Sequence, residues 1–113
     1  MIVFVEELDH RAATDSGVLH RARVFAAERE RCWEAWIVFE PVLGGDPLPS
    51  DVEVTQPTLE AVTYWASTLS PRFVDGALGR ALARAPEEQI DRTARIALRE
   101  EAAARAEADA HER

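Results

Sequence analysis

The sequence contains no lysine, and all 13 of its basic residues are arginine. This absence excludes a catalytic Schiff-base lysine and the lysine of a phosphate-binding P-loop. The single cysteine, Cys32, can form neither an intrachain disulfide nor a cysteine-rich zinc site. No apolar run approaches the roughly 18 residues that a membrane-spanning helix needs, so no membrane partner is expected.

The charge of the chain is acidic, with 21 Asp and Glu against 13 Arg and a net charge of −8. Most of the excess lies in residues 1–55, which hold 11 acids and 5 arginines. Nucleic-acid binding is not expected, because it usually needs a basic stripe. The acidic first half suits a basic protein partner, although solubility alone explains it equally well.

The cellular location is expected to be cytoplasmic. The first residues lack the basic region and the long apolar run of a secretory signal, and a lone cysteine is typical of a reducing compartment. The replacement of lysine by arginine, with abundant alanine, is typical of a GC-rich coding sequence, and a bacterial source is expected.

The length of 113 residues predicts one domain. We expect an α+β fold, in which a mainly antiparallel sheet of three to four strands within residues 2–55 packs against two to three C-terminal helices. Residues 1–85 form this domain, and residues 86–113 form a charged helix rich in Ala, Glu and Arg. The expected strands are 2–8, a hairpin of 18–27 and 32–41, and a short edge strand at 51–55, separated by loops at 9–17 and 41–50.

The first strand carries a continuous apolar run, which is typical of a strand covered on both faces. In the hairpin, a turn centred on Arg29 and Glu30 places Val24 opposite Ala35. This register predicts a core face made of Ala22, Val24, Trp33, Ala35, Ile37 and Phe39. The turn has no Gly, Asn or Asp to adopt a positive φ, so a longer or bulged turn is the alternative.

Two helices follow the sheet. Apolar residues at spacings of three and four predict a helix over 57–69, beginning near Pro57. Ser70 and Pro71 predict the cap and start of a second helix over 71–84. Its buried stripe is Val74, Leu78, Ala81 and Ala85, and its glycines, Gly76 and Gly79, would let another element approach closely.

The last helix starts at Pro86 and carries acid-before-arginine pairs four residues apart. Its large apolar residues are Ile90, Ile96 and Leu98, after which nothing larger than alanine can be buried. The end of this helix is therefore either solvated or an arm that gains order on a partner.

The second face of the hairpin is the main candidate for an interaction site. It carries the residues Leu19, Arg23, Phe25, Trp36 and Val38. Arg23 is expected opposite Trp36, with Glu34 on the diagonal, as a cation–π and ion-pair cluster. This face is either a docking surface or is covered by the protein's own helices. Tyr64 lies off the buried stripe of its helix and is a second candidate.

Catalytic, metal-binding and cofactor-binding motifs are not recognisable. His10 and Asp15 share a polar loop that could offer ligands or, with Ser16, a nucleophile, but such a loop is more often merely polar. His20 and Cys32 lie on opposite faces of the hairpin and should not share a metal. We therefore expect no cofactor, no metal and no catalytic residue.

The order of elements, a hairpin followed by a helix that opens with Thr58-Leu59-Glu60-Ala61, resembles HicB-type antitoxins over about residues 18–69. The chain departs from that pattern in its Glu28-Arg29-Glu30-Arg31 turn, in the Pro-rich loop at 41–50, and in having no recognisable DNA-binding module. The resemblance is too general to assign a family.

The working hypothesis is a non-enzymatic protein-interaction module, an adaptor or assembly subunit that docks to itself or to another protein. It would use the second hairpin face, the C-terminal helix, or both. One alternative is an acidic antitoxin or inhibitor that neutralises a basic partner. The other is an enzyme or small-ligand-binding protein that uses the His10 and Asp15 loop.

Overall fold

A computed structural model describes residues 1–84 of the chain, and within them it confirms the α+β fold. The strands are β1 Ile2–Glu7, β2 Ala12–Ala13, β3 Leu19–Arg29, β4 Cys32–Pro41, β5 Leu48–Pro49 and β6 Val54–Gln56, and the helices are α1 Leu59–Ser67 and α2 Pro71–Arg84. The predicted C-terminal helix at 86–113, its boundary with the domain and Ala85 lie outside the described residues. Neither α1 nor α2 is long and apolar enough to cross a membrane.

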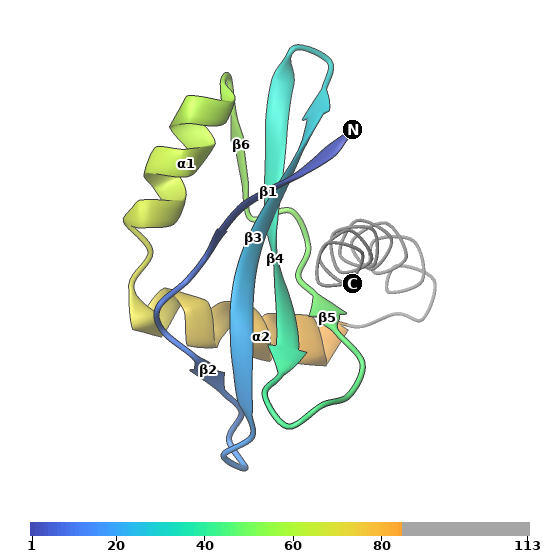
Figure 1. Ribbon diagram of the computed structural model, residues 1–113, viewed down its shortest axis with the longest axis vertical. Helices are drawn as coiled ribbons and strands as arrows, with labels where there is room; N and C mark the ends of the chain where they lie inside the picture. Colours follow the sequence, from blue (N-terminus) through green and yellow to red (C-terminus); the bar gives the residue numbers. More distant parts are fainter. Residues whose placement is uncertain (85–113) are drawn as a thin grey trace, which may run out of the picture.

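The sheet is built around the β3–β4 hairpin, and all its pairings are antiparallel. β1 and β2 pair with β3 on one side, while β5 and β6 pair with β4 on the other (Figure 1). The two-residue strands β2 and β5 lie inside segments predicted as loops. A pair of residues is too short to show the alternation that reveals a strand.

The apolar run of β1 predicted a strand that is covered on both faces, and this prediction is wrong. Phe4 is 56% exposed, and β1 forms an edge of the described sheet. Phe4 lies opposite Phe25, but Glu6 lies opposite Val24, so Val5 is an extra residue in a β-bulge. Val5 packs against the core on the same side as Val3, as alternation requires, and after the bulge Glu7 pairs with Arg23 on the face that carries Phe4 and Phe25.

The hairpin turn differs from the predicted one by one residue. Glu30 and Arg31 both adopt positive φ values, 49° and 71°, as a two-residue hairpin turn of type I′ requires. The predicted pairing of Val24 with Ala35 is therefore wrong, because Val24 lies opposite Ile37. Each residue's partner moves by two positions, so the assignment of side chains to the two faces survives.

The helices cover one face of the sheet. The Thr58 hydroxyl accepts a hydrogen bond from the Ala61 N–H at 3.0 Å, so α1 begins after Thr58, and Pro57 precedes the cap instead of lying in the first turn. Ser70 caps α2 in the same way, through the Phe73 N–H at 3.1 Å. The main core cluster combines buried residues of both layers, namely Ala22, Val24, Ile37, Phe39, Ala66, Val74, Ala77 and Leu78.

Candidate functional site

The face of the sheet opposite the helices carries a row of large apolar side chains. Phe4, Phe25 and Trp36 lie directly across from one another on three neighbouring strands, and Val38 lies two residues beyond Trp36. The rings of Phe4 and Phe25 meet edge to face, with centroids 5.6 Å apart. We call these four residues the aromatic face.

Burial on the aromatic face is uneven. Phe25 and Val38 are each 1% exposed and Trp36 is 6% exposed, whereas Phe4 on the edge strand is 56% exposed. The cluster of Phe25, Trp36 and Val38 packs with Ile2 and Ala27, and no residue of α1 or α2 belongs to it. The face is therefore neither the open patch that the sequence suggested nor a surface covered by the two described helices.

Charged residues border the aromatic face on both sides. Arg23 lies beside it, with Nε 3.0 Å from Glu7 Oε1 and Nη1 3.3 Å from Glu40 Oε2. At the turn end, Arg29 Nε lies 3.2 Å from Glu34 Oε1. Alternation along β3 and β4 places these side chains on the same face as Phe25 and Trp36.

The predicted placement of Arg23 directly opposite Trp36 is wrong. With the observed turn, Arg23 lies opposite Val38, and Trp36 lies opposite Phe25. Arg23 instead joins acids of β1 and β4, so it ties the edge strand to the hairpin. The described residues do contain a cation–π contact, but it lies elsewhere, between Arg80 and Phe73 at 5.5 Å.

Trp36 also carries a polar group with no partner. Its indole Nε1 is buried and has no hydrogen-bond acceptor within residues 1–84. A buried indole N–H usually finds an acceptor. The Trp36 N–H is therefore a hydrogen-bond donor in the middle of the aromatic face that has no acceptor among residues 1–84.

The other predicted candidates lie apart from this face. Leu19 is 46% exposed near one end of β3, and Tyr64 is 72% exposed on α1, as expected for a residue off the buried stripe. Tyr64 borders an open hollow between α1 and β6, lined by Gln56, Thr58, Glu60, Ala61, Trp65 and Thr68.

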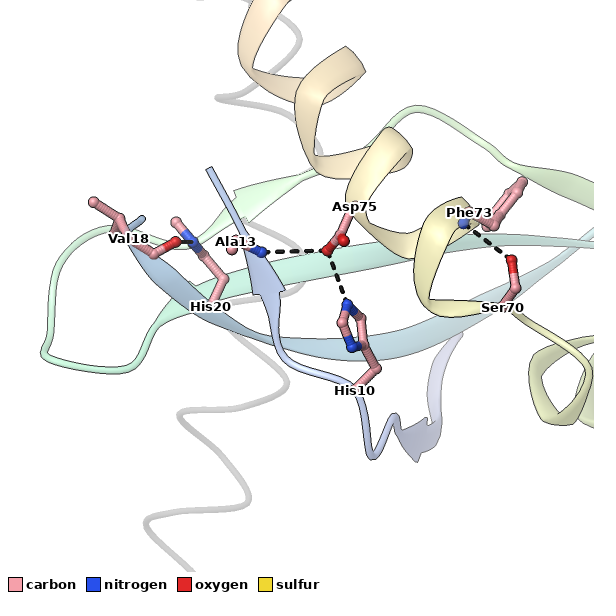
Figure 2. A network of polar contacts seen from close by, with 7 residues as sticks. All are labelled: His10, Ala13, Val18, His20, Ser70, Phe73 and Asp75. Atoms are coloured by element: carbon pink, nitrogen blue, oxygen red, sulfur yellow. Dashed lines mark hydrogen bonds and ion pairs between the residues drawn. The ribbon is translucent and has the colours of Figure 1, made fainter. Parts of the chain in front are cut away.

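The loop that carries His10 and Asp15 is held by α2. Figure 2 shows His10 Nε2 and the Ala13 N–H converging on Asp75 Oδ1, at 2.9 and 3.3 Å. The Ser16 hydroxyl instead contacts the Thr14 hydroxyl at 3.0 Å. Among residues 1–84 no three His, Cys, Asp or Glu side chains group as metal ligands would. His20 and Cys32 lie near opposite ends of the hairpin.

Phe4 and Glu7 are the members of this site that the sequence analysis missed. Their place depends on the pairing of β1 with β3 and on the bulge at Val5, which are long-range features. One signal in the sequence could have indicated the pairing. The acids Glu6 and Glu7 follow the apolar run of β1, and β3 carries Arg21 and Arg23 at alternate positions, so opposite charges could have been placed across from each other.

Comparisons with protein-family models, with curated proteins and with solved structures give no match to this chain.

Proposed function

We propose that this chain is a non-enzymatic protein-interaction module that docks a protein segment on its aromatic face. The observation that carries the proposal is the row of Phe4, Phe25 and Trp36 on the side of the sheet away from α1 and α2. A sheet domain needs only one covered face to fold, so large aromatic residues on the second face favour binding.

The chemistry of the face favours an amphipathic helix as the bound segment. Its centre is apolar, and its borders carry alternating acids and arginines that can pair with charged residues on the sides of such a helix. Trp36 Nε1 adds one buried donor that a polar side chain of the ligand can satisfy. Aromatic residues and arginine are also the residue types that most often dominate binding energy.

The test is site-specific photo-cross-linking in the full-length chain, in cells that express it. A benzophenone side chain replaces Phe4, the exposed end of the row, and a matched variant carries it at Tyr64, which is exposed on the opposite layer. We expect position 4, but not position 64, to give one reproducible protein adduct, either to another copy of the chain or to a different protein.

The captured protein is then purified and titrated against wild type and Phe4→Ser. Removing an aromatic anchor typically costs at least about 1.4 kcal/mol, so the dissociation constant should rise at least about tenfold. Tyr64→Ser should leave it unchanged. Equal binding by wild type and Phe4→Ser would overturn the proposal. Affinity that instead falls steeply with salt and depends on acids away from this face would favour the acidic-inhibitor alternative.

A further inference from the structure

We infer that the hollow between α1 and β6 binds a small organic cation of the alkylated ammonium class, in which the charged nitrogen carries methyl or other alkyl groups. The hollow is lined by residues of α1, its cap and β6, none of which belongs to the aromatic face. A small ligand there neither needs nor blocks a protein segment on that face. The site is therefore a further function, independent of the proposed one.

The hollow has the size of a small-ligand site. Its volume is about 500 Å³, within the roughly 300–1,000 Å³ of typical ligand pockets. α1 contacts β6, and Figure 1 shows the two elements side by side. Ala61 lines the hollow one helical turn before Trp65, so a small side chain leaves space beside a large one. One side is open to solvent, and we therefore expect weak, rapidly exchanging binding.

Two aromatic side chains line the hollow. Tyr64 is 72% exposed, so its ring is accessible to a ligand. Trp65 is fixed in place, because its ring meets that of Phe73 edge to face with centroids 6.3 Å apart and it packs against two core clusters. The faces of aromatic rings attract cations, and quaternary ammonium groups are typical ligands of such rings. The two side chains therefore provide a wall that suits a cation.

The charge of the hollow favours a cation as well. Glu60 is exposed and lies four residues before Tyr64, so both side chains lie on the same side of α1. Glu60 is the only charged residue among the described residues that line the hollow, and none of the ion pairs within residues 1–84 involves it. Arg80 is engaged elsewhere, with Nη2 2.6 Å from Glu53 Oε1. The carboxylate of Glu60 is therefore available to a cationic ligand.

The hydrogen bonds of the lining residues favour an alkylated ammonium over a primary one. A primary ammonium has three N–H donors, and each needs an acceptor when it leaves water. The Thr58 hydroxyl oxygen already accepts a hydrogen bond from the Ala61 N–H at 3.0 Å. The Thr68 hydroxyl donates to the Trp65 carbonyl at 2.8 Å. A quaternary ammonium has no N–H donor, so one carboxylate and the aromatic rings are sufficient partners for it.

The test is a titration of the full-length, nitrogen-15-labelled chain with choline chloride, followed by two-dimensional NMR. The matched probe is the neutral alcohol of the same shape, in which a tert-butyl group replaces the trimethylammonium group. Sodium chloride keeps the ionic strength equal in both titrations. We expect choline to shift the amide signals of residues 56–68 in a saturable manner, with a dissociation constant at least about fivefold lower than that of the alcohol.

Substitutions then remove one feature of the hollow at a time. Glu60→Gln and Tyr64→Leu should each raise the choline dissociation constant about two- to fivefold, whereas Tyr64→Phe, which keeps a ring, should not. Ala61→Leu fills the hollow and should abolish the saturable shifts. Asp46→Asn is the charge control, because the exposed Asp46 lies beyond the opposite end of β4 from Gln56. Dispersed amide signals show that each variant is folded.

Three outcomes would overturn the inference. Equal affinity for choline and the neutral alcohol would mean that the hollow binds apolar groups regardless of charge. The absence of saturable shifts in residues 56–68 would mean that it binds neither. Equal losses for Glu60→Gln and Asp46→Asn would indicate only a general attraction of cations to an acidic chain. Photo-cross-linking from position 4 depends on none of these results, and a small cation gives no protein adduct at position 64.

Discussion

The side chain of Ser50 shows how one buried hydroxyl holds the second edge of the sheet. Its Oγ accepts a hydrogen bond from the Ile37 N–H at 3.0 Å and donates one to the Asp51 carbonyl at 2.7 Å. The Ser50 N–H in turn donates to the Ile37 carbonyl at 2.7 Å. Ser50, which is 4% exposed, therefore fastens the chain directly after β5 to the centre of β4.

Ser50→Ala should lower the free energy of unfolding by about 1–3 kcal/mol, because it leaves the buried Ile37 N–H without its acceptor. The measurement is urea denaturation followed by circular dichroism. Ser67→Ala is the control, since the exposed Ser67 hydroxyl bonds only to the carbonyl of Tyr64. An equally small effect for both variants would show that the Ile37 N–H finds another partner.

The turn residues Glu30 and Arg31 are held in a locally strained backbone conformation. Residues other than glycine, asparagine and aspartate rarely adopt positive φ, and both positions here do. The sequence analysis considered this turn poor for that reason, and the structure forms it nonetheless. The pairing of two long strands outweighs the cost at two residues.

Arg31→Gly should raise the free energy of unfolding by about 0.5–1 kcal/mol, because glycine adopts the φ of 71° without strain. The same substitution two residues earlier, Arg29→Gly, should destabilise the protein, because Arg29 lies in β3 and its side chain forms an ion pair with Glu34. Thermal denaturation of both variants beside wild type measures the difference. If both substitutions changed the stability in the same direction, the positive φ of Arg31 would not be the cause of the effect.

At the scale of an element, α2 shows a clean division between a buried and an exposed side. Val74, Ala77, Leu78 and Ala81 are buried, while Leu82 is half exposed. The expectation that Gly76 and Gly79 make room for a neighbour is wrong for the described fold. A methyl group on Gly79 would meet open space, and one on Gly76 would meet only the side chain of Arg80.

Leu78→Ala should cost about 2–5 kcal/mol of stability, because it opens a cavity between α2 and the sheet. Leu82→Ala removes the same atoms from an exposed site, and a change within about 0.5 kcal/mol is expected. Chemical denaturation of wild type and both variants, fitted with one common dependence of the free energy of unfolding on denaturant concentration, gives both values. Similar losses for the two variants would mean that Leu82 is covered in solution.

At the scale of the whole molecule, the sequence predicted the fold class, the hairpin arms and α2 well. Those features depend on local signals, namely alternation over ten residues, helical spacing, and the Ser70-Pro71 start. The candidate site was predicted only in part. The hairpin placed Phe25, Trp36 and Val38 on one face in either register, because a shift of two positions preserves the alternation.

The remaining parts of the site depend on contacts between distant segments. The position of Phe4 beside Phe25 requires the β1–β3 pairing, and the bulge at Val5 then brings Glu7 opposite Arg23. The ion pair of Arg23 with Glu7 requires the same register, and the contact of His10 with Asp75 joins residues 65 positions apart. Neither periodicity nor composition carries this information, since many pairings bury similar area.

The β3–β4 hairpin also has a consequence for the order in which the chain folds. Its strands of 11 and 10 residues are joined by two residues, so pairing can start at the turn with a very short loop and extend from there. The pairing of β1 with β3 has to start from the longer loop between Glu7 and Arg23, and the docking of α2 on the His10 loop joins residues 65 positions apart. Loop-closure entropy favours the hairpin as the early structure in the transition state. The stabilisation by Arg31→Gly should therefore appear mainly as faster refolding in stopped-flow experiments, with little change in the unfolding rate.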